Sequence, residues 1–195
     1  VFKIDTSSAF QEVCMKIFQF QNQNNVVYQK WLSLLGINPA QIISYEQIPF
    51  MPISFFKYHQ IISGNQDIEK IFRSSRTTGA VASQHFVCKL SVYEESFLRC
   101  FKTFYGDINN YCILAILPGY LERNDSSLVY MVNILIQQSQ YTGSGFYLNY
   151  SDEMFKSAQN AEKDNKTILL LGVTYALLDL PEHFVFNNVI VMETG

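Results

Sequence analysis

Charged residues are scarce in this chain: Asp, Glu, Lys and Arg make up 16% of its 195 residues, against the ~25% typical of soluble domains. The net charge is −3 and no long run of Lys and Arg occurs, which excludes nucleic-acid binding as the main function. No apolar run reaches the ~18 residues of a membrane-spanning helix. Charged residues are interspersed over residues 1–20, so this segment lacks the apolar block of a signal peptide. We therefore expect a cytoplasmic protein without a membrane span.

Metal-binding and disulfide patterns are also missing. The four cysteines Cys14, Cys88, Cys100 and Cys112 share no C-x-x-C spacing, so we expect free thiols, with Cys100 and Cys112 on buried faces. The three histidines lie far apart and form no H-x-x-x-H pair, so we assign no metal ligand.

Residues 1–60 have the pattern of a helical lead-in. Apolar residues recur at helical spacing over residues 7–20 and 26–35, and Gly36 follows as a C-cap residue. In the segment Ile48-Pro49-Phe50-Met51-Pro52-Ile53 two prolines fix an extended connector. We divide the chain into this lead-in, residues 1–60, and a second part, residues 61–195.

In the second part, short strands alternate with helices. Continuous apolar runs at residues 111–117 and 167–173 are typical of strands covered on both faces. Shorter strands are predicted at residues 70–73, 84–89, 145–148 and 189–192, and helices at 91–105, 128–138, 152–163 and 175–180. The alternation over residues 110–195 predicts an α/β fold with a mostly parallel sheet flanked by helices.

The helix predicted at residues 91–105 is amphipathic. We place Val92, Phe97, Cys100, Phe101 and Phe104 on its apolar side and end it at Gly106.

Ligands of parallel α/β sheets bind beyond the carboxyl ends of the strands. Four loops follow predicted strands: residues 74–79, 118–125, 172–175 and 193–195. We expect the functional residues in these loops.

The first of these loops, Ser74-Ser75-Arg76-Thr77-Thr78-Gly79, holds four hydroxyls, a cation and a glycine in six positions. Hydroxyls and backbone N–H groups donate hydrogen bonds to phosphates without adding negative charge. The same composition is common in solvated surface loops, and neither the Walker pattern nor G-x-G-x-x-G occurs. Composition alone leaves both interpretations open.

The loop resembles the phosphate loop of the adenylate-forming enzymes, a superfamily that includes the acyl-CoA synthetases. One branch of this superfamily is more similar still: the acyl-protein synthetase and acyltransferase branch of the bacterial bioluminescence fatty-acid reductase complex. The similarity lies in this loop and in the segments 48–57, 83–85 and 192–195. The resemblance covers about residues 45–195.

The resemblance implies a two-step reaction. ATP, with Mg²⁺ on its phosphates, and a carboxylic acid, here a fatty acid, give an acyl-adenylate, and the acyl group then passes to a protein thiol or to coenzyme A. It implies that Ser74, Ser75, Thr77, Thr78 and Gly79 bind the phosphates and that Gly195 lies near the adenine. Arg76, within the same loop, is a further candidate for phosphate binding through its positive charge. It also implies that His85, Tyr120, Gly172, Val173 and Thr174 contact the substrate, and it assigns no catalytic residue.

Two departures from the family pattern stand out. Arg76 takes the place of a glycine, and the sequence given stops before the aromatic-Gly-x-Thr-Glu segment whose glutamate binds Mg²⁺ in the family. We therefore expect a fragment of a larger adenylate-forming domain, inactive alone, with an exposed apolar patch or a self-association surface. The alternative is a lapsed homologue that only binds a nucleotide, an acyl group or a partner protein.

Arg76 generates the first testable prediction. If the family glycine has a positive φ, arginine is strained there at a cost of about 1–3 kcal/mol. In the full-length protein that contains these residues, Arg76→Gly should then raise carboxylate-dependent ATP–pyrophosphate exchange by about tenfold. A lower rate in Arg76→Gly would instead identify Arg76 as a phosphate-binding cation.

Overall fold

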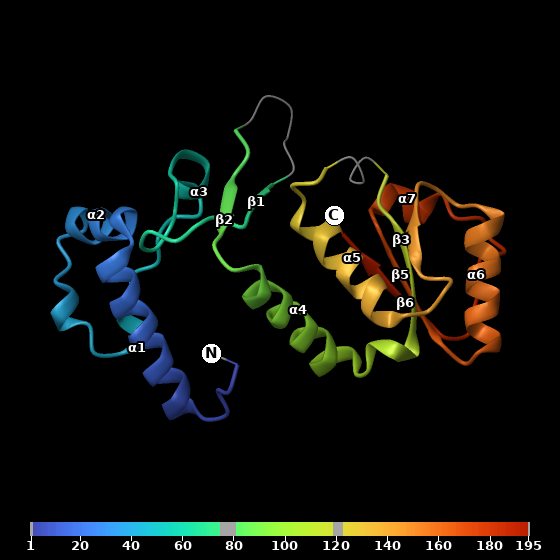
Figure 1. Cartoon of the computed structure of the whole chain (residues 1–195), viewed down its shortest axis with the longest axis horizontal. Helices are drawn as coiled ribbons and strands as arrows, with labels where there is room; N and C mark the ends of the chain where they lie inside the picture. The colour runs from blue at the N-terminus through green and yellow to red at the C-terminus, as the bar shows by residue number, and fades with distance from the viewer. Residues whose placement is uncertain (1, 75–80, 119–122, 195) are drawn as a thin grey trace. The chain divides into compact units, whose positions relative to one another are not determined.

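Two separate sheets organise the chain in the computed structural model, which describes residues 2–74, 81–118 and 123–194. The chain divides into two units, Val1–Leu90 and Ser91–Gly195, called unit 1 and unit 2 below (Figure 1).

Unit 1 begins with two capped helices. α1 (Ser7–Asn24) follows Thr6, whose side chain accepts a hydrogen bond from the backbone N–H of Ala9, and α2 (Val26–Leu34) follows Asn25, which caps it in the same way. Gly36 ends α2 with a φ of 67°, which a side chain would strain. The N–H groups of Gly36 and Ile37 bond back to the carbonyls of Ser33 and Leu32, so the predicted role of Gly36 is confirmed.

The proline connector is held against α2. The Tyr28 hydroxyl donates to the carbonyl oxygen of Pro49 at 2.8 Å, and the Trp31 indole N–H donates to that of Phe50 at 3.3 Å. Three short helices adjoin the connector: η1 (Pro39–Gln41), η2 (Tyr45–Gln47) and α3 (Phe55–Tyr58). A small core of Phe18, Tyr28 and Leu32 fixes this arrangement.

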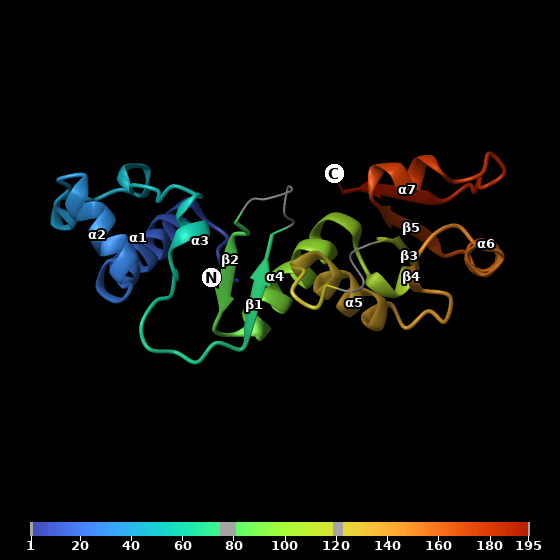
Figure 2. The same ribbon diagram turned by 90° about the horizontal axis from the view of Figure 1, so that it is seen from above.

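The rest of unit 1 is a β-hairpin (Figure 2). β1 (Lys70–Arg73) pairs antiparallel with β2 (Gln84–Val87). The sequence places the loop after β1 at the carboxyl edge of the parallel sheet. This prediction is wrong, because β1 belongs to a separate two-stranded sheet. The His85 ring stacks on Phe56, with ring centroids 5.0 Å apart, and this contact joins the hairpin to the lead-in. The boundary between the two units therefore falls after Leu90, whereas the sequence places a division after residue 60.

Unit 2 is a four-stranded parallel sheet flanked by helices, and the predicted α/β fold is confirmed. The strand order is β4-β3-β5-β6, with β3 (Tyr111–Ile116) and β5 (Thr167–Gly172) at the centre. β4 (Gly145–Tyr147) and β6 (Val189–Glu193) form the edges. The helices are α4 (Leu90–Tyr105), α5 (Ser127–Ser139), α6 (Asp152–Lys163) and α7 (Thr174–Leu178), with the short η3 (Ile108–Asn110) before β3.

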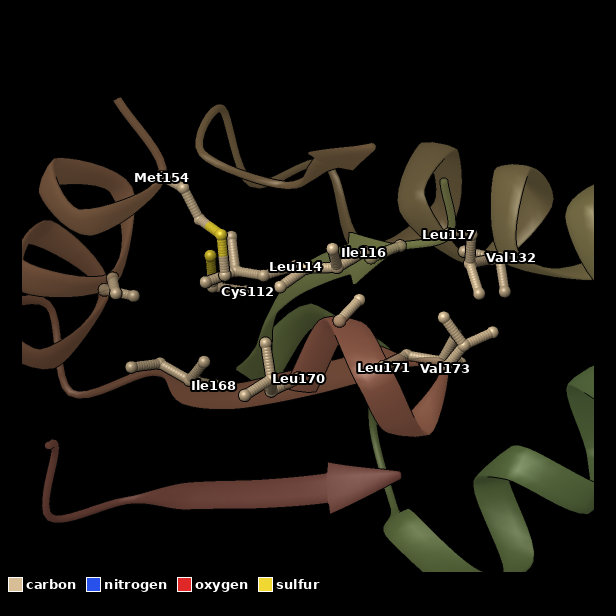
Figure 3. Packing of buried hydrophobic residues seen from close by; sticks show 14 residues of the cluster. Cys112, Leu114, Ile116, Leu117, Val132, Met154, Ile168, Leu170, Leu171 and Val173 are labelled. Carbon is tan, nitrogen blue, oxygen red and sulfur yellow. The ribbon is translucent and has the colours of Figure 1, made fainter. Parts of the chain in front are cut away.

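Helices cover both faces of this sheet. α4 and α5 lie on one side and α6 on the other (Figure 1). Because successive strand residues point to opposite faces, Ile113 packs with α4 and α5, whereas Cys112 and Leu114 pack with Met154 of α6 (Figure 3). All six residues of β3 are buried, so the predicted coverage on both faces is confirmed.

The apolar side of α4 differs from the prediction. Phe97 and Phe101 are buried as expected, but Val92 and Phe104 are 50% and 76% exposed, and Cys100 is exposed too. The packed side runs along the i, i+4 row of Tyr93, Phe97, Phe101 and Tyr105, and Leu98 beside this row packs with it. The other three residues occupy the neighbouring row, so the prediction that Cys100 is buried is wrong. Cys112 is fully buried, and all four cysteines are free thiols, as expected.

The central strand gives the second testable prediction. Leu114→Ala removes a side chain with no exposed surface, so we expect it to lower the free energy of unfolding by about 2–5 kcal/mol. The matched control is Leu178→Ala, because Leu178 is 79% exposed and should cost less than ~0.5 kcal/mol. Urea unfolding followed by circular dichroism measures both, and equal costs would contradict the burial of β3.

Candidate functional site

The carboxyl ends of three strands lie level at one edge of the unit 2 sheet. Ile116 of β3 pairs with Gly172 of β5, and Gly172 pairs with Glu193 of β6. The segments that follow, beginning at Leu117, Val173 and Thr194, therefore leave the sheet side by side. We call these ends and segments the carboxyl edge.

Hydrogen bonds tie the carboxyl edge together. The backbone N–H of Thr194 donates to the carbonyl oxygen of Gly172 at 2.9 Å, and the N–H of Val173 donates to that of Ile116 at 3.3 Å. The Thr174 hydroxyl, on the first residue of α7, donates to the Glu193 carboxylate. These bonds fix a threonine hydroxyl and a carboxylate, both on exposed residues, at the place where parallel sheets bind ligands.

Gly172 is required here by close packing. A Cβ on Gly172 would lie 2.9 Å from Leu177 Cδ2 and 3.1 Å from the carbonyl oxygen of Ile116. The absence of a side chain lets α7 begin directly against the end of β3, which brings Thr174 beside Glu193. The resemblance assigns Gly172 to substrate contact, and its packing gives it a structural role as well.

A second polar group follows β3. Arg123 Nε lies 3.4 Å from Asp125 Oδ1, and both side chains are about 30% exposed. Ser126 is buried, and its hydroxyl accepts a hydrogen bond from Val129 N at the start of α5. This ion pair and cap anchor the segment that enters α5.

The structure brings together three of the predicted site residues. Gly172, Val173 and Thr174 are consecutive at the carboxyl edge. Ser74 and His85 belong to unit 1. Ser74 extends the hairpin, since its hydroxyl accepts from Ser83 N at 3.0 Å, and His85 is exposed on β2. The remaining predicted site residues lie outside the described part of the chain: Ser75, Arg76, Thr77, Thr78, Gly79, Tyr120 and Gly195.

An aromatic cluster that the sequence does not predict lies in the part of unit 2 after β4. The Tyr150 hydroxyl lies 2.9 Å from His183 Nε2. The Tyr150 ring contacts Phe155 and Phe184, and the His183 ring contacts Phe155. The only signal in the sequence is the clustering of His183, Phe184 and Phe186, which composition does not separate from core packing.

Cys112, the buried thiol of unit 2, is unsuited to nucleophilic chemistry. Burial raises the pKa of the Cys112 thiol to about 12, so this thiol stays protonated at neutral pH and is a poor nucleophile. No group of three His, Cys, Asp or Glu side chains that could hold a metal ion occurs among the described residues.

None of the helices described is long and apolar enough to cross a membrane.

Comparisons of the chain with protein-family models, with curated proteins and with solved structures give no match.

The close approach at Gly172 gives the third testable prediction. Gly172→Ala forces its new methyl group against Leu177 and the backbone of Ile116, so we expect a loss of about 1–3 kcal/mol in the free energy of unfolding. Gly145→Ala is the matched control, because a Cβ on Gly145, also in a strand of this sheet, meets only Tyr147 Cε2 at 3.9 Å. Urea unfolding compares the two, and equal stability would show that α7 is not packed as described.

Proposed function

We propose that this chain takes part in ATP-dependent acid–thiol ligation, in which a carboxylic acid, a fatty acid by resemblance, is activated as an acyl-adenylate and passed to a protein thiol or coenzyme A. The observation that supports the proposal is the pairing of Thr174 with Glu193 at the carboxyl edge of a parallel sheet. The hydroxyl-rich segment 74–79 and the family resemblance supply the phosphate-binding part.

The pairing limits what can bind beside it. Since Thr174 donates its proton to Glu193, the pair offers hydrogen-bond acceptors and a negative charge. A phosphate or a carboxylate would be repelled there, whereas a ribose hydroxyl or an adenine amino group would donate to it. We therefore assign the pair to the nucleoside and the neighbouring Val173 to the substrate side.

In the proposed reaction, a carboxylate oxygen of the acid attacks the α-phosphorus of ATP, and the bond to pyrophosphate breaks. A thiolate then attacks the acyl carbonyl carbon, and AMP leaves with the electrons of the carbon–oxygen bond. Mg²⁺ enters the proposal through the resemblance alone, and when bound to ATP it neutralises charge on the phosphates.

A second candidate function is binding without catalysis. Besides Arg76, exposed apolar side chains of unit 2 favour it: Tyr175 and Leu178 of α7 are 58% and 79% exposed, and Val191 of β6 is 60% exposed. Exposed apolar side chains that gather in one patch are typical of interaction surfaces. This candidate includes self-association.

The fourth testable prediction separates the two candidates. Thr174→Val removes the hydroxyl and leaves Glu193 without this partner, so carboxylate-dependent ATP–pyrophosphate exchange should fall by about tenfold or more. Thr103→Val is the matched control, because among the described residues the Thr103 hydroxyl bonds only to its own helix, at Arg99 O, and exchange should be unchanged.

The exchange is measured on the gene product that contains these residues, with a panel of carboxylic acids, and circular dichroism checks that each variant folds. Equal rates in the two variants would contradict the assigned role of Thr174. No exchange by the unmodified protein with any acid, combined with retained nucleotide or acyl binding, would favour the binding function.

A further inference from the structure

Unit 1 contains an apolar pocket of about 540 Å³ between α1, α2 and the proline connector. Its volume falls within the roughly 300–1,000 Å³ of small-molecule sites. None of the described residues that line it is charged. Its apolar walls include Phe10, Cys14, Ile17, Phe18, Tyr28 and Met51.

Contacts between distant segments hold the pocket open. The Tyr28 hydroxyl binds the connector at Pro49 O, as described above. The Gln11 side chain bridges α1 to the segment before η2, donating to Ile43 O at 3.1 Å and accepting from Tyr45 N at 3.2 Å. The rings of Phe10 and Tyr45 meet edge to face at 5.1 Å. A pocket built in this way needs little reorganisation to receive a ligand.

One end of the pocket is polar. Gln21 Oε1 accepts hydrogen bonds from Asn25 Nδ2 at 3.0 Å and from Ser63 Oγ at 2.7 Å. These two donors orient the Gln21 amide so that its nitrogen is the remaining donor, and it has no hydrogen-bond partner within the described part of the chain. An amide N–H of this kind suits a carbonyl oxygen.

We propose that this pocket binds the hydrocarbon chain of an acyl group, with the acyl carbonyl at Gln21. The apolar walls remove a hydrocarbon chain from water, which stabilises the complex by about 0.8 kcal/mol for each buried CH₂. Because no charged residue lines the pocket, a neutral acyl ester, amide or thioester is bound more tightly than a free carboxylate.

A protein partner fits these walls less well. A stable protein interface covers about 800 Å² on each partner, whereas this site is a single small concavity. Its lining comes from helices and a proline-containing segment and includes no residue of β1 or β2, so an added strand has no edge to pair with. The proposal does not rest on the proposed function, since it requires neither ATP nor the carboxyl edge.

The test is binding of decanoate and of N-methyldecanamide to the 195-residue chain without ATP, measured by calorimetry and by alkylation of cysteines with N-ethylmaleimide. Both compounds should slow the alkylation of Cys14, which lines the pocket, and leave that of the exposed Cys100 unchanged. The two compounds distinguish the source of the acyl chain: tighter binding of the amide supports an esterified or thioester-linked chain, whereas tighter binding of decanoate would overturn the preference for a neutral acyl group.

Cys14→Phe fills the pocket and should weaken binding by about tenfold or more. Cys100→Phe makes the same change on the exposed surface of α4 and should leave affinity unchanged. Ile17→Phe is a second filling variant in case Cys14→Phe does not fold, and circular dichroism checks each protein. Failure of both compounds to bind, equal affinity in the two Phe variants, or a dimer that Cys14→Phe dissociates in sedimentation without any acyl binding would overturn the proposal.

Discussion

The burial of β3 on both faces is the constraint on which unit 2 depends. Parallel pairing with β4 and β5 satisfies its backbone groups, and helices on both faces remove its side chains from water. Since β3 and β5 end level, the segments after them must leave at the same edge. The close approach at Gly172 then sets where α7 begins, and this places the Thr174 hydroxyl against Glu193.

The two units offer complementary chemistry. Unit 2 presents hydrogen-bond acceptors at the carboxyl edge, which suit a nucleoside, and unit 1 presents an uncharged, apolar pocket, which suits a hydrocarbon chain. Both arise from general packing rules: parallel strands collect loops at one edge, and a helix pair held against a proline connector leaves a concavity. The two proposals concern different units, and each has its own test.

Sequence patterns predict the elements better than their contacts. The runs at 111–117 and 167–173 identify the central strands because burial on both faces leaves only apolar residues. The predicted apolar side of α4 includes Val92 and Phe104, which are exposed in the structure. The sequence does not reveal this, because these two residues are as apolar as the residues that pack. The antiparallel pairing of β1 with β2 and the pocket of unit 1 depend on segments distant in sequence, which periodicity does not relate. The loop rule names the segments after β5 and β6, and the strand register places both at the carboxyl edge. The bond between Thr174 and Glu193 could not be predicted, because it depends on that register.

The most direct test of a nucleoside site at the carboxyl edge is amide hydrogen exchange, measured by mass spectrometry with and without a non-hydrolysable decanoyl-sulfamoyl adenosine. We expect slower exchange in segments 173–177 and 193–194, and no change in the segment around Lys166, which precedes β5 at the opposite edge of the sheet. Unchanged exchange at the carboxyl edge with saturating analogue, or protection confined to the opposite edge, would contradict the account.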